Sequence, residues 1–279
     1  MIRIRADGYK ISLCVALTLY FSFQLKAQLP MGSRALSLGQ AVSALPNGQW
    51  SVFGNPALLH SDGVSLGFYS IRNYGITALT DVSATSAFIT KLGTGAVGFH
   101  RFGDELFNET RIRAGYQNEI RNVKMGVIVN YTHISFGGDY GAGGATGVDL
   151  GIAAPLTEGL WLGAIAVNIN QPQYRFAAYH EDLPRSLSLG LTYRLDENAL
   201  FALDMIKDTR FPMSYRGGIE LDILNVLHAR IGVTTEPLTY AFGIGYQTKR
   251  WAFNIGLQRH EEELLGLSPG IDFSAFVNR

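Results

Sequence analysis

Charged side chains that could bind a ligand or pair with one another recur at alternate positions of the chain, between small polar residues. An arginine guanidinium forms paired hydrogen bonds with carboxylate and phosphate groups, so such a set can bind an anionic ligand or form ion pairs inside a protein. We favour ion pairs that hold another segment of the chain, and we keep an anionic ligand as the alternative. The residues are Arg111, Arg113, Lys124, Arg194, Asp204, Arg216, Glu220, Asp222 and Arg230.

His133 and Ser135 are the pair that could support nucleophilic catalysis, because they fall on the same side of one alternating segment. A serine nucleophile needs a base that a third group holds in place, and no acidic partner can be assigned from the sequence. The run His260–Glu263 could contact a divalent cation, but a solvated charge run is the favoured interpretation. The other histidines show no metal-ligand spacing, and Cys14 is the one cysteine. We therefore predict no catalytic site, no metal site and no cofactor.

The elements that carry these residues alternate between apolar and polar positions. In six clear segments, one set of alternate positions is apolar at 25 of 25 residues and the other at 4 of 25. Successive side chains of a β-strand point to opposite faces, so a period of two residues indicates strands. The segments are 123–132, 187–194, 227–234, 240–247, 251–258 and 271–278.

The composition of the two strand faces points to a membrane. The polar face is rich in Gly, Ser, Asn and Thr, which suits a crowded, wet interior, and the apolar face carries Trp and Tyr near strand ends, as lipid-facing strands do. Charged residues are 16% of the 279 residues, against about 25% in soluble proteins, and no basic stripe indicates nucleic-acid binding. We predict an all-β fold, a transmembrane antiparallel β-barrel. A soluble β-sandwich or a secreted barrel is the alternative.

The first 27 residues have the pattern of a secretory signal peptide. Arg3, Arg5 and Lys10 precede an apolar run over 11–23, and Ala27 is a small residue suited to the cleavage site. A run of 13 residues is shorter than the roughly 20 that a transmembrane helix needs. An uncleaved N-terminal anchor is the alternative. We predict that the protein leaves the cytoplasm.

Residues 63–279 divide into about fourteen strands, with twelve as the alternative because the region 63–102 has the weakest pattern. Six short links alternate without a break with seven mostly longer ones. Outer-membrane barrels have short periplasmic turns and longer extracellular loops. We predict an integral protein of the bacterial outer membrane with both termini in the periplasm.

Aromatic residues on the apolar face give a check, because lipid-facing barrels carry aromatic belts at both membrane interfaces. Five are expected at the periplasmic interface, namely Tyr116, Trp161, Tyr193, Tyr246 and Trp251. Three are expected at the outer interface, namely Tyr131, Tyr215 and Tyr240. Between the belts, Ile244 is expected to face lipid and Gly243 the lumen. A serine at Gly243 should then cost much less stability than a lysine at Ile244.

Residues 28–62 do not alternate and precede the first strand. They combine glycines, an Ala-Leu pair, a run of small residues and an Asn-Pro-Ala sequence, with Gly32, Arg34, Gly39, Asn55 and Pro56 as the marker residues. This pattern resembles the FadL superfamily of outer-membrane proteins, and within it the PorV/PorQ branch found in bacteria with type IX secretion. The resemblance implies a fourteen-stranded barrel whose N-terminal segment folds into the lumen as a hatch. Arg34 could then pair with Asp204, Glu220 or Asp222 on the lumen wall.

Two functions follow from these expectations. The first is a PorV/PorQ-like accessory of protein secretion that acts through contacts with secretion subunits or cargo, favoured by the N-terminal pattern and the modest outer loops. The alternative is a FadL-like transporter that passes hydrophobic small molecules, favoured by the wider superfamily. Both place the barrel in contact with outer-membrane lipid, and neither is an enzyme. Recovery of secretion subunits with the protein, or of an isolated barrel with bound lipid, would separate the two.

Overall fold

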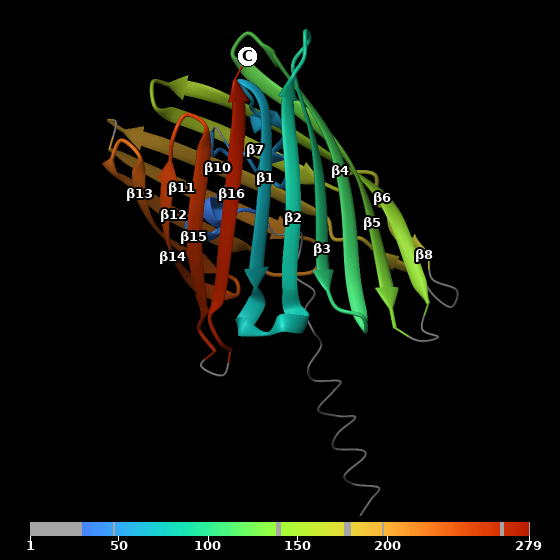
Figure 1. Cartoon of the computed structure of the whole chain (residues 1–279). Coiled ribbons are helices and arrows are strands. Elements are labelled where there is room, and N and C mark those ends of the chain that lie inside the picture. The colour runs from blue at the N-terminus through green and yellow to red at the C-terminus, as the bar shows by residue number, and fades with distance from the viewer. Residues whose placement is uncertain are drawn as a thin grey trace, which may run out of the picture.

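The computed structural model describes residues 30–46, 48–137, 141–175, 180–196, 198–262 and 265–278. Within these residues, fourteen antiparallel strands close into one barrel in sequence order, with β16 paired to β1 (Figure 1). This confirms the predicted fold class and strand number. The barrel strands are β1 (Gly63–Arg72), β2 (Thr80–Ile89), β3 (Thr94–Gly103), β4 (Phe107–Ile120), β5 (Val123–Phe136), β6 (Ala142–Thr157), β7 (Leu160–Val167), β10 (Ser186–Leu195), β11 (Ala199–Asp208), β12 (Ser214–Leu224), β13 (Leu227–Thr235), β14 (Leu238–Gln247), β15 (Trp251–His260) and β16 (Ser268–Asn278).

Short elements surround these strands. A two-stranded sheet interrupts the link between β7 and β10, so the connection that sequence treats as one long loop is partly folded. None of the described helices is long and apolar enough to cross a membrane. The short elements are the helix α2 (Ser33–Ser37), the 3₁₀ turns η1 (Ser51–Phe53), η2 (Pro56–Leu58), η3 (Asn73–Gly75) and η4 (Thr77–Leu79), and the strands β8 (Gln173–Arg175) and β9 (His180–Asp182).

The links define two ends of the barrel. We call one the tight-turn end, formed by links 90–93, 121–122, 158–159, 196–198, 225–226 and 248–250, and the other the longer-loop end, formed by links 73–79, 104–106, 137–141, 168–185, 209–213, 236–237 and 261–267. Six short links alternate with seven that are mostly longer, as expected, and 104–106 and 236–237 are the two of the seven that are as short as the tight turns. Gly63 of β1 lies opposite Asn278 of β16, so the barrel begins and finishes at the tight-turn end (Figure 1).

A two-residue turn shows how the sequence makes the tight-turn end. Arg121 and Asn122 join β4 to β5, and both have positive φ angles, 51° and 67°. Two positive angles belong to the turn type whose twist matches that of paired antiparallel strands. Ile120 is therefore placed directly opposite Val123, and the β4–β5 pairing runs without a register shift.

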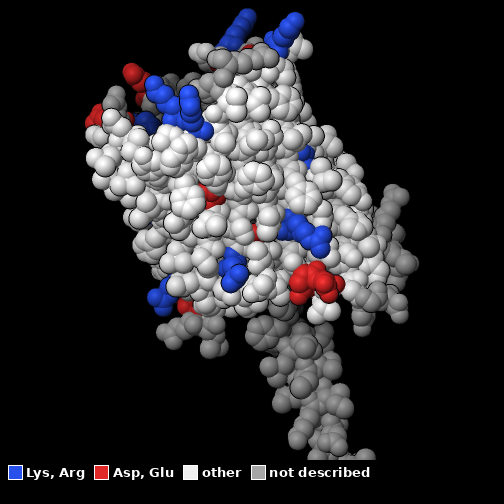
Figure 2. All heavy atoms as spheres, in the orientation of Figure 1, with Lys and Arg blue, Asp and Glu red and all other residues white. Residues whose placement is uncertain are grey.

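The outward face of the barrel is apolar. Ile244 of β14 is 60% exposed and its cross-strand neighbour Ile255 is 49% exposed, whereas Ala241 on the opposite face is 2% exposed. In Figure 2 most atoms on the visible wall are uncharged, and Lys, Arg, Asp and Glu gather mainly toward the ends. An exposed apolar band flanked by polar ends is the surface that a lipid bilayer covers.

Seven of the eight belt aromatics lie on this outward face. Tyr246 and Trp251 contact each other across the β14–β15 turn, with ring centroids 5.2 Å apart. The seven are Tyr116, Tyr131, Tyr193, Tyr215, Tyr240, Tyr246 and Trp251, each at least 37% exposed.

Trp161 is the exception, and its expected lipid contact is wrong. It pairs with Thr192 of β10, which is buried on the inner face. Trp161 packs on that face against Ala57 and Leu58, with the Lys124 ammonium 5.3 Å from its ring centroid. β7 is apolar on both sides, so its sequence does not mark which side faces lipid.

Replacing Ile244 by lysine is expected to lower the free energy of unfolding in lipid vesicles by about 2–4 kcal/mol, the range for a cation at mid-bilayer on a barrel wall. Val277→Lys is the matched control, because Val277 also faces outward but lies at the end of β16, where a cation costs only about 0–1 kcal/mol. Equal costs for the two variants would contradict the assigned bilayer position.

Candidate functional site

Residues 30–62, which we call the luminal segment, lie inside the barrel. Asn47, the first two residues of the expected segment (28–29) and the expected signal peptide are outside the described residues. Its apolar side chains Met31, Leu36, Trp50, Val52, Phe53 and Leu59 form one buried cluster with wall residues of β1, β2, β3 and β5. Leu38, Ala41 and Leu45 form a second cluster with Leu200 and Ala202 of β11. The segment therefore packs against widely separated parts of the wall.

Wall glycines allow this close packing. A Cβ atom at Gly163 of β7 would lie 1.9 Å from the carbonyl oxygen of Ser43, and one at Gly243 of β14 would lie 1.9 Å from Ser37 Oγ. Such positions accept no side chain unless the luminal segment moves. Gly243 faces inward, as expected, but its contact with Ser37 removes the reason to expect a mild effect of Gly243→Ser, because the lumen at this level is filled and not open.

Arg34 joins the luminal segment to the wall through Glu220 of β12. Its Nε and Nη2 atoms donate to the two carboxylate oxygens, each at 2.8 Å. Arg230 of β13 donates from Nε to the same carboxylate at 2.6 Å, and Arg194 approaches it to 3.8 Å. Of the three carboxylates proposed as partners for Arg34, the structure selects Glu220.

Electrostatics keep Arg34 charged. Burial by itself lowers the pKa of Arg34, but the facing Glu220 carboxylate outweighs burial, so the pKa is raised above its ordinary value. Two guanidinium groups on one buried carboxylate leave local positive charge, which the nearby Asp222 and Asp272 carboxylates offset.

Asp204 and Asn55 hold the next part of the luminal segment. Asp204 of β11 accepts from the backbone N–H groups of Val42 and Ser43, at 2.8 and 2.9 Å, and from the Ser43 hydroxyl. Asn55 donates to the carbonyls of Ser43 and Ile152, and its Oδ1 accepts from the N–H of Ala57. The Asn-Pro sequence thus caps η2 and ties it to β6.

Other marker residues of the sequence have mainly conformational roles. Gly39 has a φ of +62°, and a Cβ there would lie 2.5 Å from the Val233 carbonyl oxygen. Arg216 donates to the carbonyl of Gln40. Gly32, with a φ of +96°, lies against the Trp50 ring, where a Cβ would be 2.4 Å from Cδ1.

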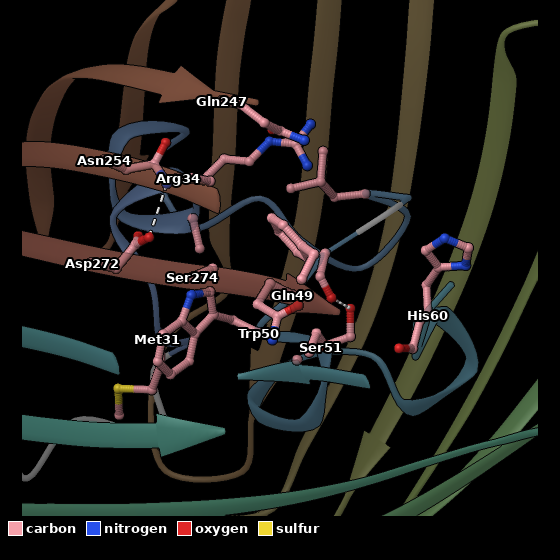
Figure 3. Close-up of a pocket in the computed structure, with 18 of the residues that line it drawn as sticks. Met31, Arg34, Gln49, Trp50, Ser51, His60, Gln247, Asn254, Asp272 and Ser274 are labelled. Atoms are coloured by element: carbon pink, nitrogen blue, oxygen red, sulfur yellow. Dashed lines mark hydrogen bonds between the residues drawn. The ribbon is translucent and has the colours of Figure 1, made fainter. Parts of the chain in front are cut away.

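A cavity of about 370 Å³ remains between the luminal segment and the wall. It reaches the tight-turn end, since Asp62, Thr248 and Lys249 line it. Figure 3 shows Trp50 and Arg34 on the segment side and Asp272 on β16, whose carboxylate accepts from Asn254 at 2.9 Å. The lining is mixed, with apolar Met31, Val42 and Leu45 beside polar groups.

Trp50 is the side chain in this cavity most suited to touch a ligand. It is 8% exposed, and its indole Nε1–H has no hydrogen-bond acceptor among the described residues. A buried donor without an acceptor costs free energy. The apolar lining residues Met31, Val42 and Leu45 give the cavity a surface suited to the apolar body of a small molecule.

The remaining predicted charges lie on the inner face, as the alternation indicated. Arg113 pairs with Asp149 and stacks over the Phe53 ring at 5.7 Å, and Arg111 pairs with Glu109. Lys124 lies 4.0 Å from Glu119. Near the tight-turn end, Asp222 pairs with Arg194 and His228.

Several buried polar residues were not assigned as site residues from the sequence. Asp149, which is fully buried, receives hydrogen bonds from Asn130 and from the backbone of Asn168. His100 contacts Asp81 at 2.6 Å. Asp149 and Asp272 stand on the polar side of their strands, so alternation could have found them; Trp50 lies in the non-alternating segment and gave no such signal.

The candidate catalytic pair is not assembled into a site. His133 stacks on Tyr131, an outward-facing residue, with ring centroids 6.5 Å apart. Thr132 and Ile134 take the buried face between them, so Ser135 is also on the outward side. The ring centroids of His260 and Tyr74 are 4.5 Å apart. Glu263 is outside the described residues. The described residues contain no group of three or more His, Cys, Asp or Glu that could hold a metal.

Comparison with known proteins identifies the fold. No family model and no curated protein matches this sequence. The toluene transporter TbuX of Ralstonia pickettii has a TM-score of 0.65 at 12% identity, over 92% of this chain and 100% of TbuX. The monoaromatic hydrocarbon channel CymD has a TM-score of 0.66 at 12% identity, over 90% of this chain and 99% of CymD. A FadL homologue of Pseudomonas aeruginosa has a TM-score of 0.58 at 11% identity, over 88% and 97%. This chain therefore has the fold of these transporters and channels, and the PorV/PorQ branch is not shown.

Proposed function

We propose that this protein is an outer-membrane channel of the FadL type that passes small hydrophobic molecules through a lumen plugged by residues 30–62. The observation that carries the proposal is the full-length fold similarity to a toluene transporter and a hydrocarbon channel. The cavity beside Trp50 supports it, because apolar side chains line part of a space inside the barrel. The tight-turn end faces the periplasm in this proposal, as short turns do in bacterial barrels.

The secretion-accessory role has no comparable support. It rests on the N-terminal sequence pattern, and the described Asn55 and Pro56 have structural roles at η2 that any lumen-filling segment would need. The fold comparisons quoted above concern transporters and channels. We therefore take transport as the function and treat association with secretion subunits as an outcome that its test can reveal.

Toluene uptake tests the proposal. Cells with an intact lipopolysaccharide layer that express the protein are expected to take up labelled toluene, at low external concentration, faster than cells without it. Trp50→Ala should change the uptake rate, because it alters the cavity wall. Trp251→Ala is the matched control, since Trp251 faces outward at the barrel end and should leave uptake unchanged.

Two results would count against transport. Uptake equal to that of non-expressing cells, with the barrel correctly inserted, would remove the function. Recovery of secretion subunits by crosslinking from native outer membrane, together with unchanged uptake, would instead favour the accessory role.

A further inference from the structure

Three arginines interrupt the apolar outer wall at the longer-loop end. Each is the last outward side chain of its strand: Arg72 in β1, Arg101 in β3, where only Gly103 follows on that face, and Arg259 in β15, and all three are exposed. Apolar side chains precede each of them on the same face, as Leu66 and Phe68 do for Arg72. These cations therefore stand where the apolar band stops, not at the tips of loops.

The three arginines belong to one side of the barrel. Their strands alternate in the sequence of neighbours β15-β16-β1-β2-β3, so adjacent arginines are separated by two strand spacings, about 10 Å. Arg72 lies opposite Thr80, and Arg101 lies opposite Val82, two positions along β2. On the other side, Ile71 of β1 pairs with Gly270 of β16, and Gly270 pairs with Gly256 of β15. Arg259 follows Gly256 by three positions in β15. Figure 2 shows this wall, with Lys and Arg atoms on its half away from the C-terminus.

These guanidinium groups have no partner among the described residues. Within the described ranges, none of the three makes a hydrogen bond or an ion pair, in contrast to the luminal Arg34, Arg111, Arg113 and Arg230. Lys207 has a comparable outward position in β11 but donates to the Phe211 carbonyl at 2.6 Å, so it is not part of the set. Exposed acidic residues of the adjoining loops, Glu105, Glu261 and Glu262, form no ion pair with them.

The longer-loop end also carries outward tyrosines, including Tyr240 opposite Arg259, but the tight-turn end has no outward arginine at its described strand ends. There the outward strand ends carry Tyr116, Tyr193, Tyr246 and Trp251, while the basic residues Lys91, Arg121 and Arg250 lie in the turns. Aromatic rings suit the region between acyl chains and headgroups. Unpaired arginines at the corresponding depth of the other end suit phosphate, because a guanidinium forms charge-assisted paired hydrogen bonds with phosphate oxygens.

We propose that Arg72, Arg101 and Arg259 form a binding surface for the phosphate groups of an outer-leaflet glycolipid. The inference rests on the membrane placement of the proposed function but not on transport. Basic residues beside a membrane attract anionic headgroups, and three groups on alternate strands of a rigid wall can contact more than one phosphate of the same layer. The lipid would then cover this side of the longer-loop end.

Native mass spectrometry of the detergent-solubilised protein tests this surface with diphosphorylated lipid A as the probe. The wild-type protein is expected to retain this lipid and to lose its dephosphorylated form. The variant Arg72→Gln/Arg101→Gln/Arg259→Gln should retain it about tenfold less, since three charge-assisted contacts are removed. The control Lys91→Gln/Arg121→Gln/Arg250→Gln removes the same charge from the tight-turn end and should bind as the wild type does.

Several results would overturn the inference. They are equal retention of the phosphorylated and dephosphorylated lipids by the wild type, equal losses in the two triple variants, or displacement of the lipid by inorganic phosphate at low concentration, which would indicate a site for the free ion. The comparison of the phosphorylated with the dephosphorylated lipid uses only the wild-type protein, so a variant that fails to fold does not prevent the test. A protein that binds the lipid but takes up no toluene would refute the transport function alone, and one that does not insert into vesicles would refute the membrane placement.

Discussion

Deleting residues 30–60, with the preceding residues kept, is expected to turn a poorly conducting barrel into a steady open channel. A barrel of about eight strands is filled by its own side chains, and this one has fourteen strands in its described part. The luminal segment supplies the missing filling, and the wall opposite it carries glycines such as Gly163 and Gly218 that leave the space empty when the segment is absent. Planar-bilayer recordings of the purified protein measure the change.

The parent protein is the reference for this experiment, and a gel shift between heated and unheated samples checks that the shortened barrel folds. A barrel that folds, inserts and conducts no better than the parent would show that residues 30–62 do not block the lumen. The segment would then be better explained as a docking arm for a periplasmic partner.

Glu220→Gln is expected to lower the free energy of unfolding by about 3–5 kcal/mol, the range for removing one partner of a buried ion pair. Glu220 is 3% exposed and its carboxylate accepts from both Arg34 and Arg230, so its loss leaves two neighbouring guanidinium groups without their direct partner, with only the more distant Asp222 and Asp272 as counter-charges. Because Arg34 belongs to the luminal segment, the variant should also raise the bilayer conductance, to a level between those of the parent and the deletion.

Glu119→Gln provides the matched control. Its carboxylate is 4.0 Å from Lys124, and its side chain is 47% exposed, so solvent screens the pair. We expect a loss of at most about 1 kcal/mol and no change in conductance. If the two variants lost equal stability, the Arg34–Glu220–Arg230 contact would not be what fastens the segment to the wall.

The strands were predictable because their pattern is local. A wall that faces lipid on one side and a packed lumen on the other requires opposite chemistry at successive residues, and this holds from Val123 to Thr132 as it does from Trp251 to Gln258. The same property identified the luminal charges, since each stands at an inward position. Trp161 was misplaced because β7 is apolar on both sides, so its sequence does not show which side faces lipid.

The lack of alternation identified the luminal segment, but it did not show how the segment packs against the wall. That Arg34 pairs with Glu220 and not with Asp204 depends on where α2 lies against β12 and β13, and that Gly243 faces Ser37 depends on a contact between residues 206 positions apart. The Trp50 cavity and the unpaired Arg72, Arg101 and Arg259 likewise depend on the barrel closing β16 against β1. Alternation fixes the side of the wall on which a residue stands, whereas its neighbours are set by strand register and by the packing of a non-repeating segment, and both are properties of the closed barrel.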